Sequence, residues 1–349
     1  MRRRVVRFVV SLLPLALGCA AHAVSCTTES QMTAMERGTL EKASLSLADA
    51  VQTANLAALK AQTLPSVAAK FSGIASSVQA VQPFLQHATL TADALYILDA
   101  TELTNAQEAQ FFCGVPGSAL IVTVTIPNLP PGRYALAILH ATGVEHPQQI
   151  SLILSDAPGA EGWKLAGFFT RPMTLGGHDG IWFWRQARAY AGKKQDWNAW
   201  FYYQTAQYLL NPVDFLTSPN LQKLQREAED VQPGGLPGEQ PMALSSDGRN
   251  FEITNIHSGE LAGQLDLVVN FKSAPEPDPV AARAEVTAVM RALLQQHPEL
   301  ASAFHGLWVY ADAPGGQPPF ALELPMSEIQ NSVSPAGQPA TNNSGRQTG

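Results

Sequence analysis

The segment 32–80 is rich in Ala, Leu, Gln and Ser, and its apolar residues recur at helical spacing. Three of these residues fall on one helix face, namely Leu40, Leu47 and Val51. Asn55 and Pro65 interrupt the pattern, because proline is poorly tolerated inside a helix. The pattern predicts two or three short helices rather than one long helix.

Beyond residue 84 the apolar positions alternate or are β-branched, which is typical of strands. The segments predicted as strands are 96–98, 110–113, 120–126, 134–140, 150–154 and 163–169. Residues 128–132 combine Asn, Pro and Gly and predict a turn between two of them. Helices followed by consecutive strands predict an α+β domain over residues 24–172, with N-terminal helices packed on a curved antiparallel sheet.

This order of elements is similar to the cone-shaped folds of the nuclear-transport-factor-2 or cystatin type. The similarity covers residues 36–170 and includes the closing Trp-Lys-Leu-Ala-Gly-Phe-Phe strand at 163–169. The turn at 129–134 also resembles one found in secreted β-sandwich modules related to carboxypeptidase regulatory domains. The residues leave both alternatives open.

Residues 173–231 predict a helical hairpin and a following helix. From Gly180 onward, small and aromatic residues fall in an order that resembles a tetratricopeptide repeat of about 34 residues, at Ala187, Tyr190, Ala199, Tyr203 and Ala206. Because one such unit cannot bury its own apolar face, residues 214–229 are expected to form a capping helix. An ordinary antiparallel helix pair packed on the first domain explains the same residues.

Residues 232–247 predict a linker, because Pro and Gly dominate their first half. A small α/β unit is expected over 248–328, with strands at 251–256, 265–271, 307–310 and 320–324. Its helix is predicted to begin at Asp278, which serves as the N-cap before Pro279. Residues 329–349 are rich in Ser, Pro, Gly and Asn and predict a disordered tail.

Residues 1–23 have the three parts of a secretory signal peptide: four arginines, an apolar run over 8–17, and Ala21-His22-Ala23 as a cleavage site. Cleavage there leaves a chain with no predicted transmembrane helix, in the periplasm or outside the cell. Gly18-Cys19 also resembles a lipoprotein processing site, in which Cys19 carries the lipid anchor at the cell envelope. The arginine cluster further resembles a twin-arginine signal.

Composition limits the partners of the exported chain. Loss of the four signal arginines leaves 18 basic and 29 acidic residues, a formal charge of −11, which argues against nucleic acid. Only 15 % of the residues are charged and 46 % are hydrophobic, as in a well-packed globular chain. If Cys19 leaves with the signal, Cys26 and Cys113 remain, and an oxidising compartment predicts a disulfide between them; two buried free thiols are the alternative.

No catalytic motif is found in the sequence. The best candidate is His178 beside Asp179 in a glycine-rich turn, but Asp179 as the cap of a helix beginning near Ile181 explains the same residues. The histidines lack the close spacing of metal ligands, so neither a metal nor a cofactor is expected.

The densest chemical feature is the aromatic cluster of the hairpin. The residues predicted to form a binding surface for a protein or a glycan are His178, Trp182, Trp184, Trp197, Trp200 and Tyr202. A helix pair buried between the sheet and the C-terminal unit also explains the cluster. The leading hypothesis is an exported, non-enzymatic binding or scaffold protein of the bacterial envelope. One alternative is an envelope lipoprotein. The other is a hydrolase that uses the pocket of the first domain or the His178 loop.

Overall fold

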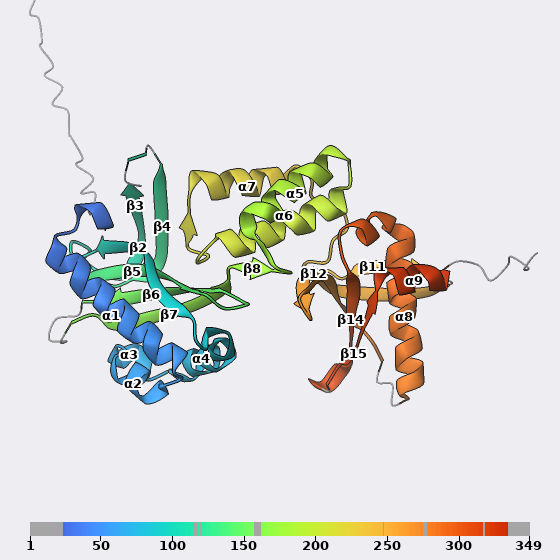
Figure 1. Ribbon diagram of the computed structural model, residues 1–349, viewed down its shortest axis with the longest axis horizontal. Helices are drawn as coiled ribbons and strands as arrows, with labels where there is room; N and C mark the ends of the chain where they lie inside the picture. The colour runs from blue at the N-terminus through green and yellow to red at the C-terminus, as the bar shows by residue number, and fades with distance from the viewer. Residues whose placement is uncertain are drawn as a thin grey trace, which may run out of the picture.

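The chain has the predicted α+β fold, arranged as an N-terminal unit, a helical hairpin and a C-terminal unit (Figure 1). The computed structural model describes residues 24–114, 117–118, 120–156, 162–246, 248–274, 278–316 and 318–333. The predicted signal peptide, Cys19 and residues 334–349 of the predicted tail lie outside these residues. No helix in the described part of the chain has the length and apolar character needed to cross a membrane.

The N-terminal unit begins with strand β1 (Ser25–Thr28), a 3-10 turn η1 (Glu29–Gln31) and four helices. They are α1 (Ala34–Gln52), α2 (Leu56–Ala61), α3 (Pro65–Ala68) and α4 (Ser72–Leu85). Helix α1 is longer than the short helices predicted, because a capping box between Thr33 and Glu36 starts it and buried apolar residues continue along one face. Asn55 caps α2 and Pro65 is the first residue of α3, so both act as the helix boundaries predicted.

The central sheet has the strand order β1-β2-β5-β6-β7 and is antiparallel throughout. Its longer strands are β2 (Thr89–Asp99), β5 (Arg133–Thr142), β6 (Gln148–Ser155) and β7 (Lys164–Pro172). The four helices pack on one face, where α1 residues such as Leu47 contact sheet residues such as Leu139 within one core. Every residue of β6 is buried, so the opposite face is covered as well.

A second, three-stranded sheet covers that opposite face. It consists of β3 (Gln107–Gly114), β4 (Ile121–Leu129) and the short β10 (Leu216–Thr217), in the order β10-β4-β3. Phe111 and Val124 from this sheet share a core with Leu136 of β5. The expected turn lies between β4 and β5, which belong to different sheets. Strand β4 pairs with β3 and β10, whereas β5 pairs with β2 and β6. The turn therefore carries the chain from one sheet to the other.

The predicted disulfide between Cys26 and Cys113 is confirmed. It links β1 of the central sheet to β3 of the second sheet across a sequence separation of 87 residues. Cys113 is fully buried. The bond therefore ties together the two sheets that enclose the core between them.

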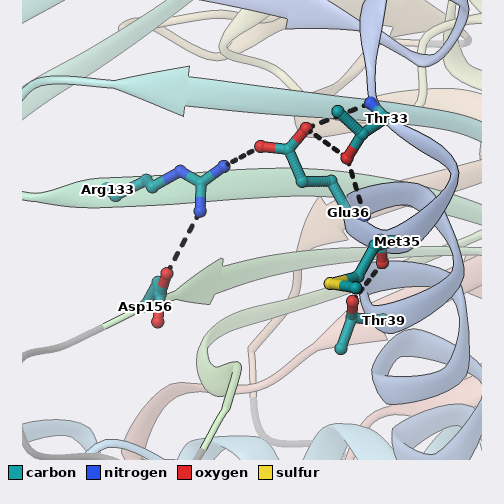
Figure 2. A network of polar contacts seen from close by, with 6 residues as sticks. All are labelled: Thr33, Met35, Glu36, Thr39, Arg133 and Asp156. Carbon is teal, nitrogen blue, oxygen red and sulfur yellow. Dashed lines mark hydrogen bonds and ion pairs between the residues drawn. The ribbon is translucent and has the colours of Figure 1, made fainter.

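An ion-pair network holds the start of α1 against the first residue of β5, Arg133 (Figure 2). Arg133 Nη2 lies 2.7 Å from Glu36 Oε1, and Arg133 Nη1 lies 3.3 Å from Asp156 Oδ2. Hydrogen bonds from the Thr33 backbone N–H and hydroxyl outweigh the effect of burial and lower the pKa of Glu36, and Arg133 lowers it further. In the first turns of α1, the hydroxyl of Thr39 also donates to the carbonyl of Met35.

The hairpin follows two short strands, β8 (Thr174–Leu175) and β9 (His178–Asp179). It consists of α5 (Gly180–Gly192) and α6 (Asp196–Leu210), and α7 (Pro219–Glu229) packs beside α6 (Figure 1). The segment predicted as hairpin plus capping helix thus contains three helices, and its resemblance to a tetratricopeptide repeat stays a prediction.

The C-terminal unit is a five-stranded sheet with helices α8 (Pro279–Gln296) and α9 (Met326–Val333). Its order is β11-β12-β13-β14-β15, from β11 (Met242–Ser246), β12 (Arg249–Leu261), β13 (Gln264–Lys272), β14 (Gly306–Asp312) and β15 (Phe320–Pro325). Strands β13 and β14 are parallel, and α8 with the 3-10 turn η2 (Pro298–Ser302) connects them; a second such turn, η3 (Pro314–Gly316), precedes β15.

Two sequence expectations differ from this arrangement. Strand β11 lies inside the segment 232–247 assigned to a linker, where it pairs with β12 and buries Leu244. Helix α9 extends into the segment 329–349 assigned to a disordered tail, and Ile329 is fully buried. Both elements are short, and each is stabilised by contacts with distant parts of the chain rather than by its own sequence.

The hairpin and the C-terminal unit share one hydrophobic core. Phe183 of α5 and Tyr202 of α6 belong to it together with Val289 of α8 and Val309 of β14. The ring of Phe304, just after η2, lies 5.8 Å from that of Tyr202 and 6.2 Å from that of Phe201. The hairpin is thus a structural part of the C-terminal half of the molecule.

Candidate functional site

Two of the residues predicted to bind a partner lie in the shared core. Trp197 is 8 % exposed and stacks on His297 with ring centroids 3.8 Å apart. Tyr202 is 3 % exposed, and its hydroxyl donates to the carbonyl of Ala303 at 2.6 Å. Burial, with the nearby Tyr190, strongly raises the pKa of Tyr202. These two side chains stabilise the hairpin against η2 and present little surface to a partner.

His178 is exposed at the entrance to the hairpin and stacks on Trp182, with ring centroids 3.7 Å apart and 5° between the planes. The side chain of Asp179 accepts a hydrogen bond from the Trp182 backbone N–H at 2.7 Å, which confirms Asp179 as the N-cap of α5. The Asp179 carboxylate is thus used to begin the helix, and among the described residues no ion pair or hydrogen bond joins an acid to His178.

Trp184 lies at the contact between α5 and α7. Its indole N–H donates to Glu227 Oε2 at 2.7 Å, and Arg188 binds both oxygens of the same carboxylate at 2.7 and 2.8 Å. The guanidinium of Arg188 also lies over the Trp184 ring, 4.6 Å from its centroid. Burial raises the pKa of Glu227, but the hydrogen bonds from Arg188 and Trp184 outweigh it and the net shift is downward. This geometry identifies Trp184 as part of a helix-to-helix junction.

Trp200 lies in the wall of a cavity of about 650 Å³, a size at which protein pockets hold small organic ligands. One wall is a stripe of α6, formed by Trp200, Phe201, Gln204, Thr205 and Tyr208. The facing wall comes from β12 through Ile256, His257 and Ser258. Leu175 of β8 and the segment after α7, with Gln232, Leu236 and Pro237, complete the lining. We call this cavity the α6–β12 groove.

The α6–β12 groove is aromatic and, among the described residues, has no Asp, Glu, Lys or Arg in its lining. Trp200 is half-buried and Tyr208 is 48 % exposed, so both rings offer apolar surface to a ligand. The amides of Gln204 and Gln232 are exposed and add uncharged hydrogen-bonding groups. The groove is therefore suited to a neutral molecule that is mainly apolar.

The buried hydroxyl of Ser258 has no hydrogen-bond partner within the structure. An unpaired buried hydroxyl is costly, typically by roughly 1–3 kcal/mol. Ser258 is one of the residues that line the α6–β12 groove. Among the described residues that line the groove, this hydroxyl is the one buried polar side-chain atom without a hydrogen-bond partner.

Of the residues that line the groove, Trp200 was predicted from the sequence and the others were not. The α6 residues of the wall have the spacing of one helical stripe, a signal visible in the sequence. His257 and Ser258 belong to a strand that pairs with β11 and β13, and nothing in their local sequence indicates that they face α6. Tertiary folding brings these segments together.

No protein-family model matches this chain, and neither a curated protein nor a solved structure is significantly similar to it.

Proposed function

We propose that this chain is an exported binding protein that holds a neutral, mainly apolar small molecule in the α6–β12 groove. The observation that carries the proposal is a cavity of about 650 Å³ with aromatic side chains on one wall, an unpaired buried hydroxyl on the other and no acidic or basic residue among its described lining. Such a lining favours transfer of apolar surface out of water and gives a charged ligand nothing to pair with.

Two features support a site of action outside the cytoplasm. The sequence of residues 1–23 has the three parts of a secretory signal. The Cys26–Cys113 disulfide fits an oxidising compartment, because cytoplasmic thiols are kept reduced. We infer that the chain works in the periplasm or outside the cell.

Binding rather than catalysis is supported by the chemistry of the groove. His257 is its only described lining residue of the type that serves as a general base, and its Nδ1 lies 2.9 Å from the backbone oxygen of Ser258 rather than beside a carboxylate. A hydrolytic site usually pairs its nucleophile with an oriented base. The groove contributes shape, aromatic surface and neutral hydrogen-bonding groups.

The uncharged fluorescent probe N-phenyl-1-naphthylamine tests this proposal, because its emission rises when it leaves water. We expect saturable binding of one probe per chain. Gln204→Trp places a large side chain at an exposed groove position, where the indole should fill part of the groove. Because the probe can then bury less apolar surface, binding should weaken by at least about tenfold.

Gln222→Trp is the matched control, because Gln222 is an exposed residue of α7 outside the groove lining. This variant should bind the probe like the unmodified protein. Equal affinity in all three proteins, or no saturable binding, would contradict the proposed function.

A further inference from the structure

Three strands of the C-terminal sheet bring one histidine and two carboxylates together. Asp266 lies in β13, Glu323 lies in β15, and His305 immediately precedes β14, the strand between them. His305 Nδ1 is 3.2 Å from Asp266 Oδ1 and 3.8 Å from Glu323 Oε1. One nitrogen or oxygen from each side chain lies within 4.8 Å of the others. We call these three residues the 266–305–323 cluster.

The backbone fixes the position of this cluster. The His305 N–H donates to the carbonyl of Leu265 at 2.8 Å, and the His305 carbonyl accepts from the N–H of Met326 at 2.8 Å. The histidine is thereby held between β13 and the first residue of α9. The neighbouring Leu267 points into the shared core, so alternation along β13 directs Asp266 to the opposite face of the sheet.

A glycine of the neighbouring strand β14 lies beside the two carboxylates. It is Gly306, which follows His305. A Cβ atom at Gly306 would lie 2.6 Å from Glu323 Oε1 and 3.1 Å from Asp266 Oδ1, so any larger residue would push the two carboxylates apart. Glycine inside a strand often marks a place where another group must approach closely.

The cluster carries more negative charge than its partners balance. Asp266 is 1 % exposed, yet its Oδ2 atom has no hydrogen-bond partner, and neither has the buried Oε1 of Glu323. Within the described chain, the ion pairs of both carboxylates involve His305 alone. Two buried acceptor atoms and a shared histidine leave the site short of positive charge.

We propose that Asp266, His305 and Glu323 form a binding site for one divalent transition-metal ion of the zinc type. Zinc binds imidazole nitrogen and carboxylate oxygen at about 2.0–2.2 Å, which places tetrahedral ligand atoms about 3.4 Å apart. The measured separations of 3.2 and 3.8 Å bracket this value. One imidazole and two carboxylates favour zinc over calcium or magnesium, which prefer oxygen ligands alone.

The site has an open side. The His305 side chain is 43 % exposed, whereas Asp266 is buried beneath it. Three protein ligands leave the fourth tetrahedral position for water or an exogenous ligand, as in zinc sites that are not purely structural. This site was not predicted from the sequence, because Asp266 and His305 are 39 residues apart in the chain. This inference is independent of the α6–β12 groove.

The test uses the full exported chain after dialysis against a chelator. Titration with zinc chloride, followed by calorimetry and elemental analysis, should give one zinc ion per chain and a raised melting temperature, while calcium chloride at the same concentration should leave the melting temperature unchanged. His305→Ala should weaken zinc binding by at least about 100-fold, since even outer-shell changes cost about 10- to 100-fold. Cobalt(II) added in place of zinc should show the visible absorption of a low-coordinate site, and His305→Ala should lose it.

Two further variants separate metal binding from folding. Asp266→Asn keeps the shape of the buried side chain and removes its charge, so the metal-free variant should fold and melt at or above the temperature of the metal-free parent, yet lose zinc binding. His87→Asn removes an exposed histidine in the N-terminal unit and should leave zinc binding unchanged. The proposal is overturned if the parent shows no saturable zinc binding, or if His305→Ala or Asp266→Asn binds zinc with the stoichiometry and affinity of the parent.

Discussion

Breaking the Cys26–Cys113 disulfide should destabilise the N-terminal unit far more than the rest of the chain. The bond closes a loop that contains β1, all four N-terminal helices, β2 and most of β3. With a separation of 87 residues, the chain-entropy relation gives a contribution of about 4 to 5 kcal/mol to the free energy of unfolding. For a unit of this size, that loss lowers the melting temperature by roughly 10 to 20 °C.

The effect should be local because the molecule has separate cores. The helices and the central sheet form one core, the two N-terminal sheets form a second, and the hairpin shares a third with the C-terminal unit. The crosslink connects elements of the first two cores. Reduction should therefore split thermal unfolding into an early transition of the N-terminal unit and a later one near the original temperature.

Far-UV circular dichroism and tryptophan fluorescence distinguish these transitions. Trp163 lies in the N-terminal unit, whereas the remaining tryptophans belong to the hairpin and the C-terminal unit, at Trp182, Trp184, Trp197, Trp200 and Trp308. The early transition should thus lower the circular dichroism signal in part and change the fluorescence little. The double variant Cys26→Ala/Cys113→Ala should behave like the reduced protein and not respond to reductant.

An unchanged melting temperature after complete reduction would refute the chain-entropy argument. A single transition that shifts equally by both probes would refute the independence of the cores.

Three further predictions concern the hairpin and the groove. Glu227→Gln should cost roughly 2 kcal/mol of stability, because it removes the charged acceptor of Arg188 and Trp184. Because the pKa of Glu227 is lowered in the folded state, this stabilisation is present above pH 4.5 and is lost as the pH falls through the folded-state pKa. The melting temperature should therefore fall less on acidification in Glu227→Gln than in the parent, with Glu229→Gln at an exposed position as the control. Gly180→Ala should lower stability by about 1 to 3 kcal/mol in denaturant titrations, because the added Cβ atom would lie 2.5 Å from Leu210 Cγ. Gly192→Ala in the same helix is the control: its Cβ atom meets no neighbour within 4 Å, so it should cost nothing. In the groove, 1-naphthol should bind roughly 2- to 10-fold more tightly than naphthalene by pairing with Ser258, and Ser258→Ala should abolish that difference; a preference that survives the substitution would locate the hydrogen bond elsewhere.

Local sequence patterns predicted the elements better than their arrangement. Asp278 caps α8 with Pro279 at its first turn, and Asp179 caps α5, because capping depends on a few adjacent residues. The β-branched run before residue 127 forms a strand as expected. The sheet to which this strand belongs could not be predicted, because alternation of apolar residues indicates that one face of a strand is buried but does not indicate which partner covers that face.

The same distinction applies to the sites. The disulfide was predicted because Cys26 and Cys113 are the two cysteines that remain once the predicted signal peptide is removed. The α6–β12 groove draws on α6, β8, β12 and the segment after α7, and the 266–305–323 cluster draws on three strands. Neither has a local motif, since the residues of the groove meet only when the hairpin packs on the C-terminal sheet, and those of the cluster meet only when the strands of that sheet pair. Trp200 was recognised because aromatic density is a local property, whereas Ser258 and Asp266 lie in ordinary strand sequence.

The most direct test of the central claim is a crystal structure of the chain without residues 1–23 in complex with N-phenyl-1-naphthylamine. The account predicts electron density for the probe between α6 and β12, in contact with Trp200 and Tyr208 and with its amine near Ser258. Density for the probe at another apolar surface, with the α6–β12 groove holding only water, would contradict it.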